Sequence, residues 1–332
     1  MYERFYRLSG IPFQLTPDSR FFFSSSGHAR AIAHLIYGLS QQEGFIVITG
    51  EIGAGKTTLV EHLWSQIDRT AYVIARVVTT QISNDDLLRL IMANFDLEAE
   101  GADKATLLGR FAAMVREHHA HGRRCLLVVD EVQNLTLPAL EELRMLSNIT
   151  VDGRASVQTI LLGQPQFRLT LARPETEQLR QRVLASYHLE ALTEDETRAY
   201  IEHRLRTVGW QGDPHWERDA LTAVYDLTGG IPRRINTLCT RVLLLGALEE
   251  AHTVTSEMVE STAMELQQDL GAGLPSAARV AAPDLPIAAA APHEVVEMLL
   301  RRVQALEHGV ARQERVFRRL VDMLSAFIEP RA

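Results

Sequence analysis

The sequence has almost no lysine. Of its 34 basic residues only two, Lys56 and Lys104, are lysines, and the remaining 32 are arginines. With 42 acidic residues, the chain of 332 residues has a formal net charge of −8. An acidic chain lacks the basic surface that typically guides a protein to nucleic acid, so nucleic acid is not an expected partner. In a chain that uses arginine almost everywhere, each lysine position is informative.

Cysteine and long apolar runs are also scarce. The two cysteines, Cys125 and Cys239, are too few for a disulfide framework or a four-cysteine zinc site, and both fit small core residues. No stretch approaches the roughly 20 apolar residues that span a bilayer. The first seven residues lack the apolar core of a signal peptide. We therefore expect a cytoplasmic protein without a transmembrane segment, in which any peripheral membrane contact would be made through partners.

The central part of the chain alternates between strand and helix patterns. Residues 1–27 are rich in aromatic residues and turns and predict an irregular collar, whereas residues 28–190 predict an α/β core. Strands are expected at 45–49, 72–78, 125–129, 157–162 and 186–189, and helices at 28–40, 56–67, 84–95, 104–119 and 137–146. Alternation of this kind is typical of a parallel sheet that is covered by helices on both faces.

Beyond residue 190 the expected organisation changes. The Thr193–Glu196 segment reads as a capping box, and four helical patterns follow it, so we expect an all-helical lid at 191–268. Residues 269–292 are rich in Ala and Pro and predict a linker. Residues 293–329 carry a heptad repeat, which predicts a coiled-coil helix and a homo-oligomer. An amphipathic helix that packs on its own chain is the alternative.

One segment matches the phosphate-binding pattern G-x-x-x-x-G-K-[ST] at every fixed position. It reads Gly50-Glu-Ile-Gly53-Ala54-Gly55-Lys56-Thr57 and is followed by Thr58. The glycines let backbone amides point at phosphate oxygens, and the helix that follows adds its positive end. Lys56 would reach the β- and γ-phosphates, and the Thr57 hydroxyl would bind Mg²⁺. The segment lies between an expected strand and an expected helix, which predicts a site for ATP with Mg²⁺.

A second apolar strand ends in two carboxylates, Asp130 and Glu131. Because the carboxyl ends of parallel strands meet at one edge of a sheet, these carboxylates should lie near the phosphates. Asp130 would hold Mg²⁺ through water, and Glu131 would polarise the attacking water. The simpler alternative is that the pair only marks the start of a helix.

Three further polar residues are candidates for the same site. Gln164, after the strand at 157–162, would orient the water or touch the γ-phosphate. Asn148 is a rival for that role, and an exposed loop glutamine is the alternative. Arg233, at the start of a lid helix, and Arg182, before the last strand, would clamp developing phosphate charge. Arg180 is the alternative to Arg182, and a surface salt bridge is the alternative for each arginine.

Together these motifs resemble the AAA+ ATPases. The segments Met-Tyr-Glu-Arg-Phe-Tyr at 1–6, Leu-Thr-Pro-Asp at 15–18, Gly-Gln-Pro at 163–165 and Leu-Arg-Gln-Arg at 179–182 resemble one branch of them. This branch is the general secretion pathway protein A type, with the ATPases of exosortase (PEP-CTERM) exopolysaccharide systems most similar. The resemblance covers about residues 1–268.

The resemblance implies roles for the candidate residues. Residues 50–58 would be the Walker A loop, and Asp130 with Glu131 the Walker B pair. Gln164 would be sensor 1, Arg182 a finger that acts on a neighbouring subunit, and Arg233 sensor 2. Two features depart from the family pattern. Secretion-type members continue into a transmembrane helix and a peptidoglycan-binding domain, whereas residues 269–329 of this chain predict a linker and a coiled coil. At sensor 1, Asn or Thr is commoner than the Gln found here.

The function expected from the sequence is Mg²⁺-dependent ATP hydrolysis. By the resemblance, hydrolysis would be coupled to the assembly or export of envelope or exopolysaccharide components. Two alternatives remain at this point. The chain would otherwise be an ATP-dependent nucleic-acid helper of the transposition or origin-recognition type, or a nucleotide-gated scaffold whose coiled coil transmits the signal.

Overall fold

The computed structural model describes residues 1–16, 18–78 and 84–269. They form two compact units. The larger unit comprises residues 14–207 and 228–237, and the smaller comprises residues 1–13, 208–227 and the described residues from 238. The expected linker and coiled-coil helix, apart from Asp269, lie outside the described residues. The domain boundaries expected from the sequence remain a proposal.

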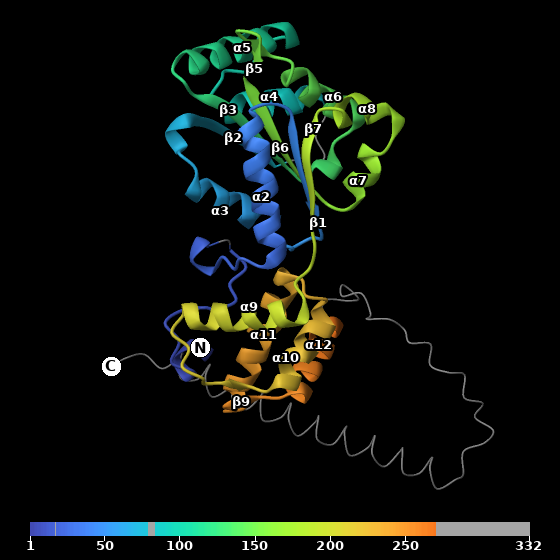
Figure 1. The fold of residues 1–332 in the computed structure, drawn as a ribbon. Coiled ribbons are helices and arrows are strands. Elements are labelled where there is room, and N and C mark those ends of the chain that lie inside the picture. The colour runs from blue at the N-terminus through green and yellow to red at the C-terminus, as the bar shows by residue number, and fades with distance from the viewer. Residues whose placement is uncertain (17, 79–83, 270–332) are drawn as a thin grey trace, which may run out of the picture. The chain divides into compact units, whose positions relative to one another are not determined.

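The larger unit is built on a five-stranded parallel sheet with the order β2-β3-β6-β1-β7 (Figure 1). The strands are β1 (Phe45–Gly50), β2 (Tyr72–Val78), β3 (Arg124–Asp130), β6 (Val157–Gly163) and β7 (Val183–Leu189). All residues of β1 and β6 are buried, as the continuous apolar runs predict for central strands of a parallel sheet. The predicted α/β class is therefore confirmed.

Helices cover both faces of this sheet, and successive strand residues serve opposite faces. Ile46 and Ile48 pack on α2 (Ser26–Gln41) and α3 (Lys56–Gln66), and α2 lies in front of the sheet in Figure 1. Phe45 and Val47 point to the other face. Its helices are α4 (Asn84–Asn94), α5 (Lys104–Ala120), α6 (Leu137–Leu146), α7 (Gln166–Leu171) and α8 (Glu177–Arg180). Burial of apolar surface in both layers stabilises the fold by roughly 25 cal/mol for each Å² removed from water.

Side-chain caps fix where several helices begin. The Ser25 hydroxyl accepts a hydrogen bond from the backbone N–H of His28 at the start of α2. Asp103 accepts one from the backbone N–H of Thr106 at the start of α5. At the start of α9 (Glu194–Thr207) the predicted capping box is confirmed. The Glu196 amide donates to Thr193 Oγ1 at 3.2 Å, and the Thr193 amide donates to Glu196 Oε2 at 3.1 Å.

The smaller unit is mostly helical. Its helices are α1 (Tyr2–Phe5), α10 (Arg218–Thr228), α11 (Pro232–Leu248) and α12 (Ser256–Asp269), except that Thr228 of α10 and residues 232–237 of α11 belong to the larger unit. Two short strands, β8 (His215–Trp216) and β9 (Thr253–Val254), pair in parallel. The lid predicted at 191–268 is helical apart from these two strands, which were not predicted because two-residue strands are too short to produce a periodic pattern. The N-terminal segment is held in this unit by Tyr6, whose hydroxyl donates to the Ala251 carbonyl at 2.9 Å.

Other short elements were not predicted either. A hairpin of β4 (Thr150–Val151) and β5 (Arg154–Ala155) turns at Asp152 and Gly153, which both have positive φ. The 3₁₀ turns are η1 (Ser19–Phe21), η2 (Arg69–Ala71), η3 (Val132–Asn134) and η4 (Pro174–Thr176). None of these elements is longer than about one period of the patterns that reveal strands and helices.

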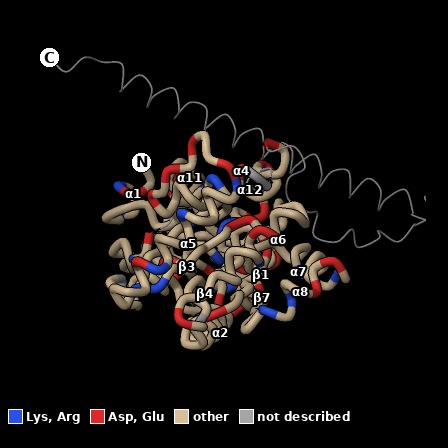
Figure 2. Tube along the Cα trace, turned by 90° about the horizontal axis from the view of Figure 1, so that it is seen from above, with Lys and Arg blue, Asp and Glu red and all other residues tan. Residues whose placement is uncertain are grey.

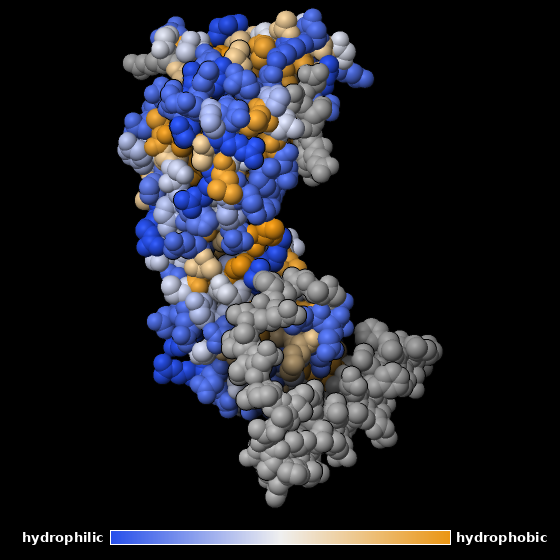
Figure 3. Space-filling view, turned by 90° about the vertical axis from the view of Figure 1, so that its right-hand side faces the viewer, coloured by the Kyte–Doolittle hydropathy of each residue, from blue (hydrophilic) through white to orange (hydrophobic). Residues whose placement is uncertain are grey.

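The surface carries charges of both signs. Acidic and basic residues are both scattered along the described chain in Figure 2, and Figure 3 shows apolar side chains exposed at separate places on one face. Among the described residues, no helix combines the length and hydropathy needed to cross a bilayer.

Candidate functional site

The phosphate-binding pattern forms the turn between β1 and α3. Gly53 and Gly55 have φ angles of +83° and +98°, a region that residues with a side chain rarely adopt. A Cβ atom on Gly53 would also collide with Cβ of Arg233. The backbone amide of Arg233 donates to the Gly53 carbonyl at 3.2 Å. The loop therefore requires glycine at position 53 for its own conformation and for its contact with the first turn of α11.

Lys56 begins α3 and is only 6% exposed. Its Nζ donates to the carbonyls of Gly50 at 2.8 Å and Glu51 at 3.0 Å. Burial lowers the pKa of Lys56, and the negative charges of Glu131 and Asp130 oppose that shift. The ammonium is thus held within the loop by backbone oxygens, where phosphate oxygens can replace them.

Thr57 and Asp130 meet as the sequence predicts. The Thr57 hydroxyl donates to Asp130 Oδ2 at 2.8 Å, and the Glu131 amide donates to Asp130 Oδ1 at 2.9 Å. Asp130 is 5% exposed. A hydroxyl and a carboxylate are hard oxygen ligands, which suit Mg²⁺ together with waters and phosphate oxygens. The donor set therefore fits the metal that the sequence predicts.

Arg76 on β2 is a member of this site that sequence reasoning missed. Its Nη2 contacts Asp130 Oδ2 at 3.3 Å, and its Nη1 contacts Glu61 Oε1 at 3.1 Å. Arg76 lies two residues before Val78, which is the residue of β2 that pairs with Asp130. The available signal was a lone arginine inside the apolar strand Tyr-Val-Ile-Ala-Arg-Val-Val.

Glu131 is held by two glutamines. Gln164 donates from Nε2 to Glu131 Oε2 at 3.1 Å, and Gln133 donates to the same oxygen at 2.5 Å. The backbone N–H of Gln164 in turn donates to Gln133 Oε1 at 2.9 Å. Gln133 was not singled out from the sequence, although it stands two residues after Glu131. Asn148, the rival of Gln164, is exposed and has its amide near Met145 Sδ.

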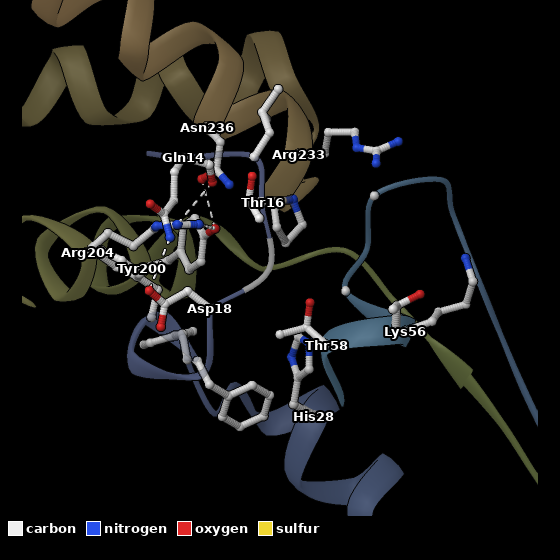
Figure 4. Close-up of a pocket in the computed structure, with 18 of the residues that line it drawn as sticks. Gln14, Thr16, Asp18, His28, Lys56, Thr58, Tyr200, Arg204, Arg233 and Asn236 are labelled. Atoms are coloured by element: carbon white, nitrogen blue, oxygen red, sulfur yellow. Dashed lines mark hydrogen bonds between the residues drawn. The ribbon is translucent and has the colours of Figure 1, made fainter. Parts of the chain in front are cut away.

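The predicted arginines lie in different places. Arg233 lines the same cavity as Lys56 (Figure 4). Arg182 precedes β7, and its Nη1 donates to Ser147 Oγ at 3.0 Å while its carbonyl accepts the Phe45 amide at the start of β1. This is the amino edge of the sheet, a strand length or roughly 20 Å from the phosphate loop. Arg182 therefore does not reach the site of its own chain, and exposed Arg180 precedes the same edge.

The cavity beside the loop has a volume of about 250 Å³, and all of its lining residues belong to the larger unit. Behind the loop it is closed by Tyr200 and Arg204 of α9 and Asn236 of α11. Arg204 Nη1 donates to the Tyr200 hydroxyl at 2.7 Å, and that hydroxyl donates to Asn236 Oδ1 at 2.8 Å. The Arg204 guanidinium lies 4.7 Å from the ring centroid of Phe21. The sequence did not predict this part of the cavity, because it joins the expected collar to the expected lid.

Comparison with known proteins identifies the central segment. The AAA domain family matches residues 39–171, from the end of α2 to the end of α7. General secretion pathway protein A of Aeromonas hydrophila is 36% identical over 270 residues. That alignment covers 80% of this chain and 48% of the relative, so the chain spans about half the length of that protein.

Solved structures share the fold at low identity. Cdc6p from Pyrobaculum aerophilum has a TM-score of 0.61 and 16% identity, over 82% of this chain and 74% of that one. The ADP form of the Aeropyrum pernix ORC2 protein has a TM-score of 0.57 and 20% identity, over 79% and 72%. Drosophila ORC bound to DNA has a TM-score of 0.56 and 16% identity, over 80% and 65%. At these identities the likeness concerns the fold alone.

Proposed function

Because the chain is an AAA+ protein of the general secretion pathway protein A type, we propose that it binds ATP with Mg²⁺ and hydrolyses it. The observation that carries this proposal is the arrangement of Lys56, Thr57, Asp130 and Glu131 at the carboxyl edge of one parallel sheet. Carboxyl edges of such sheets are where nucleotides bind in α/β folds.

Each residue would have a separate task. The amides of residues 50–58, including Ala54 and Thr58, would bind the phosphates, and Lys56 would leave the loop carbonyls for the β- and γ-phosphates. Thr57 and Asp130 would hold Mg²⁺, which neutralises charge on the phosphates when bound. Glu131 would accept a proton from the attacking water, with Gln164 fixing its carboxylate. Arg233, beside Gly53, would contact the γ-phosphate.

The two lysines provide a matched test of nucleotide binding. Lys56→Ala should abolish detectable binding of a fluorescent ATP analogue, because it removes the ammonium from the loop. Lys104→Ala should bind as the wild type does, since Lys104 begins α5, forms an ion pair with Glu142 of α6 and does not line the cavity. Equal binding by Lys56→Ala and wild type would contradict the proposal.

We further propose that the active form is a homo-oligomer in which Arg182 acts on the neighbouring subunit. This fits the position of Arg182 at the amino edge of the sheet, where it cannot serve its own chain. Arg182→Ala retains Glu131, and Glu131→Gln retains Arg182, so a mixture of the two inactive variants should regain part of the ATPase activity. If the mixture stays inactive and the wild type has the same specific activity at all concentrations, the subunit contact is wrong.

The cellular role that we propose is the assembly or export of envelope or exopolysaccharide components from the cytoplasmic side. Its support is the relationship to general secretion pathway protein A, of which this chain spans about half. Deletion of the gene should reduce surface polysaccharide, and the wild-type gene should restore it whereas Glu131→Gln should not. Restoration by Glu131→Gln would instead favour the nucleotide-gated scaffold.

A nucleic-acid helper is the second candidate, because the fold is shared with Cdc6p and ORC proteins, one of which is bound to DNA. The net charge of −8 does not favour it. An ATP-dependent, salt-sensitive mobility shift of duplex DNA would support this candidate over envelope export.

A further inference from the structure

His28 lies in the first turn of α2, and its ring lines the cavity together with Gly55 and Thr58 (Figure 4). The residue is 6% exposed. A Cβ atom built on Gly55 would lie 3.0 Å from His28 Nε2, so this nitrogen stands directly beside the phosphate loop. In Figure 4, His28 and Thr58 are both drawn to the left of the Lys56 ammonium.

The other ring nitrogen is bound to Ser25. Ser25 Oγ accepts the backbone N–H of His28 at 3.2 Å and lies 2.7 Å from His28 Nδ1. Ser25 is buried, so its hydroxyl proton needs a protein acceptor. Among the described residues, Nδ1 is the acceptor within reach of that hydroxyl. A neutral imidazole that accepts at Nδ1 carries its proton on Nε2.

The surroundings hold this ring in place and keep it neutral. Phe22 packs edge-on against it, with ring centroids 5.7 Å apart. Burial lowers the pKa of His28 to about 4; His62 lowers it further, and Glu196 opposes the shift. At neutral pH the ring therefore offers an N–H donor without a positive charge.

We propose that His28 Nε2–H donates a hydrogen bond to an α-phosphate oxygen of the bound nucleotide and so positions it. The α-phosphate is the acceptor because Lys56 serves the β- and γ-phosphates, whereas His28 Nε2 stands beside Gly55, in the loop whose backbone amides hold the α- and β-phosphates. The donor adds direction at the α-phosphate, while the charge that binds the triphosphate comes from Lys56 and Mg²⁺. This inference rests on the proposed nucleotide binding.

Two substitutions separate the donor from the shape of the ring. His28→Phe keeps an aromatic ring against Phe22 and removes the donor, whereas His28→Gln places an amide N–H near the position of Nε2. The Kd values of fluorescent ADP and ATP should both rise about tenfold or more in His28→Phe, as expected for loss of a hydrogen bond to a charged acceptor. In His28→Gln both should stay within about threefold of wild type. Thermal unfolding of both variants checks that they fold.

Nuclear magnetic resonance of ¹⁵N-labelled histidine provides the second readout. The spectrum should show His28 as the Nε2–H tautomer at pH 7, and that resonance should shift when ADP is added. The inference is overturned if the tautomer is Nδ1–H, if both variants bind like wild type, if both lose affinity equally, or if the loss is confined to ATP. Failure of the wild-type protein to bind either nucleotide would instead overturn the proposed function.

Discussion

Gln164 donates a hydrogen bond from Nε2 to Oε2 of Glu131 across 3.1 Å. The two residues follow neighbouring strands, β6 and β3, so the contact joins the ends of the sheet's central strands. The carboxylate of Glu131 is thereby fixed at the edge of the sheet where the phosphate loop begins. Its orientation depends on Gln164 as well as on its own backbone.

Gln164→Ala should therefore reduce catalysis more than binding. Without the Gln164 side-chain amide, Gln133 is the one of these two glutamines that still binds Glu131 Oε2. A misplaced general base should lower kcat by roughly 10²-fold. The Kd for ATP should change by less than about threefold, because Gln164 lies outside the residues that line the cavity in the described chain. Steady-state kinetics and nucleotide titration measure the two values. Asn148→Ala serves as the control, since exposed Asn148 should not affect either.

Arg76 should set the affinity of the site for the divalent cation. Its guanidinium lies 3.3 Å from Asp130 Oδ2, and a positive charge there opposes a second one. Arg76→Gln should tighten binding of Mn²⁺ in the presence of ADP by roughly threefold, a modest effect because Arg76 is partly exposed. Electron paramagnetic resonance of free Mn²⁺ reports this directly. In Arg206→Gln, which breaks an exposed ion pair with Glu202 on α9, the affinity should stay unchanged, and weaker Mn²⁺ binding in Arg76→Gln would refute the charge argument.

Two glycines with different surroundings test the loop geometry. Gly53→Ala introduces a Cβ at φ +83° and against Arg233, so nucleotide affinity should fall at least about tenfold. Gly109→Ala, in the interior of α5 with nothing within 4 Å of the added Cβ, should stabilise the protein by roughly 0.5–1 kcal/mol and leave binding unchanged. Unaltered binding by Gly53→Ala would show that the loop adapts.

His28 makes the stability of the larger unit depend on pH. Its pKa is near 4 in the folded protein and about 6.5 in the unfolded chain, so between these values the unfolded chain binds the extra proton. The contribution of neutral, buried His28 to the free energy of unfolding is complete above pH 6.5. It falls by up to roughly 3 kcal/mol as the pH approaches 4. Wild type should lose stability relative to His28→Gln across this window in chemical unfolding. Parallel curves for the two proteins would exclude this contribution.

The sequence predicted best the helices, strands and loop that depend on residues close together in the chain. The strand at 72–78 and the helix at 137–146 have the predicted bounds, because long apolar periods determine them. The phosphate loop followed from the order of its glycines and Lys56. β7 begins at Val183, three residues before the predicted start at 186. This strand lies at the edge of the sheet, and its buried and exposed residues do not follow the regular pattern of the central strands.

What the sequence did not predict depends on contacts between distant segments. Arg76 is one of 32 arginines, and only the pairing of β2 with β3 brings it to Asp130. His28 and Gly55 are 27 positions apart in the chain, and their contact depends on how α2 packs beside the loop. Arg204, Tyr200 and Asn236 join through the fold as well.

The most direct test of the account is the ATPase activity of Glu131→Gln. The substitution keeps the size of the side chain and removes its basicity, while Lys56, Thr57 and Asp130 stay in place. We predict that this variant binds ATP with a Kd within about threefold of wild type and turns it over roughly 10²–10³-fold more slowly. ATP hydrolysis by Glu131→Gln at the wild-type rate would contradict the assignment of the catalytic base.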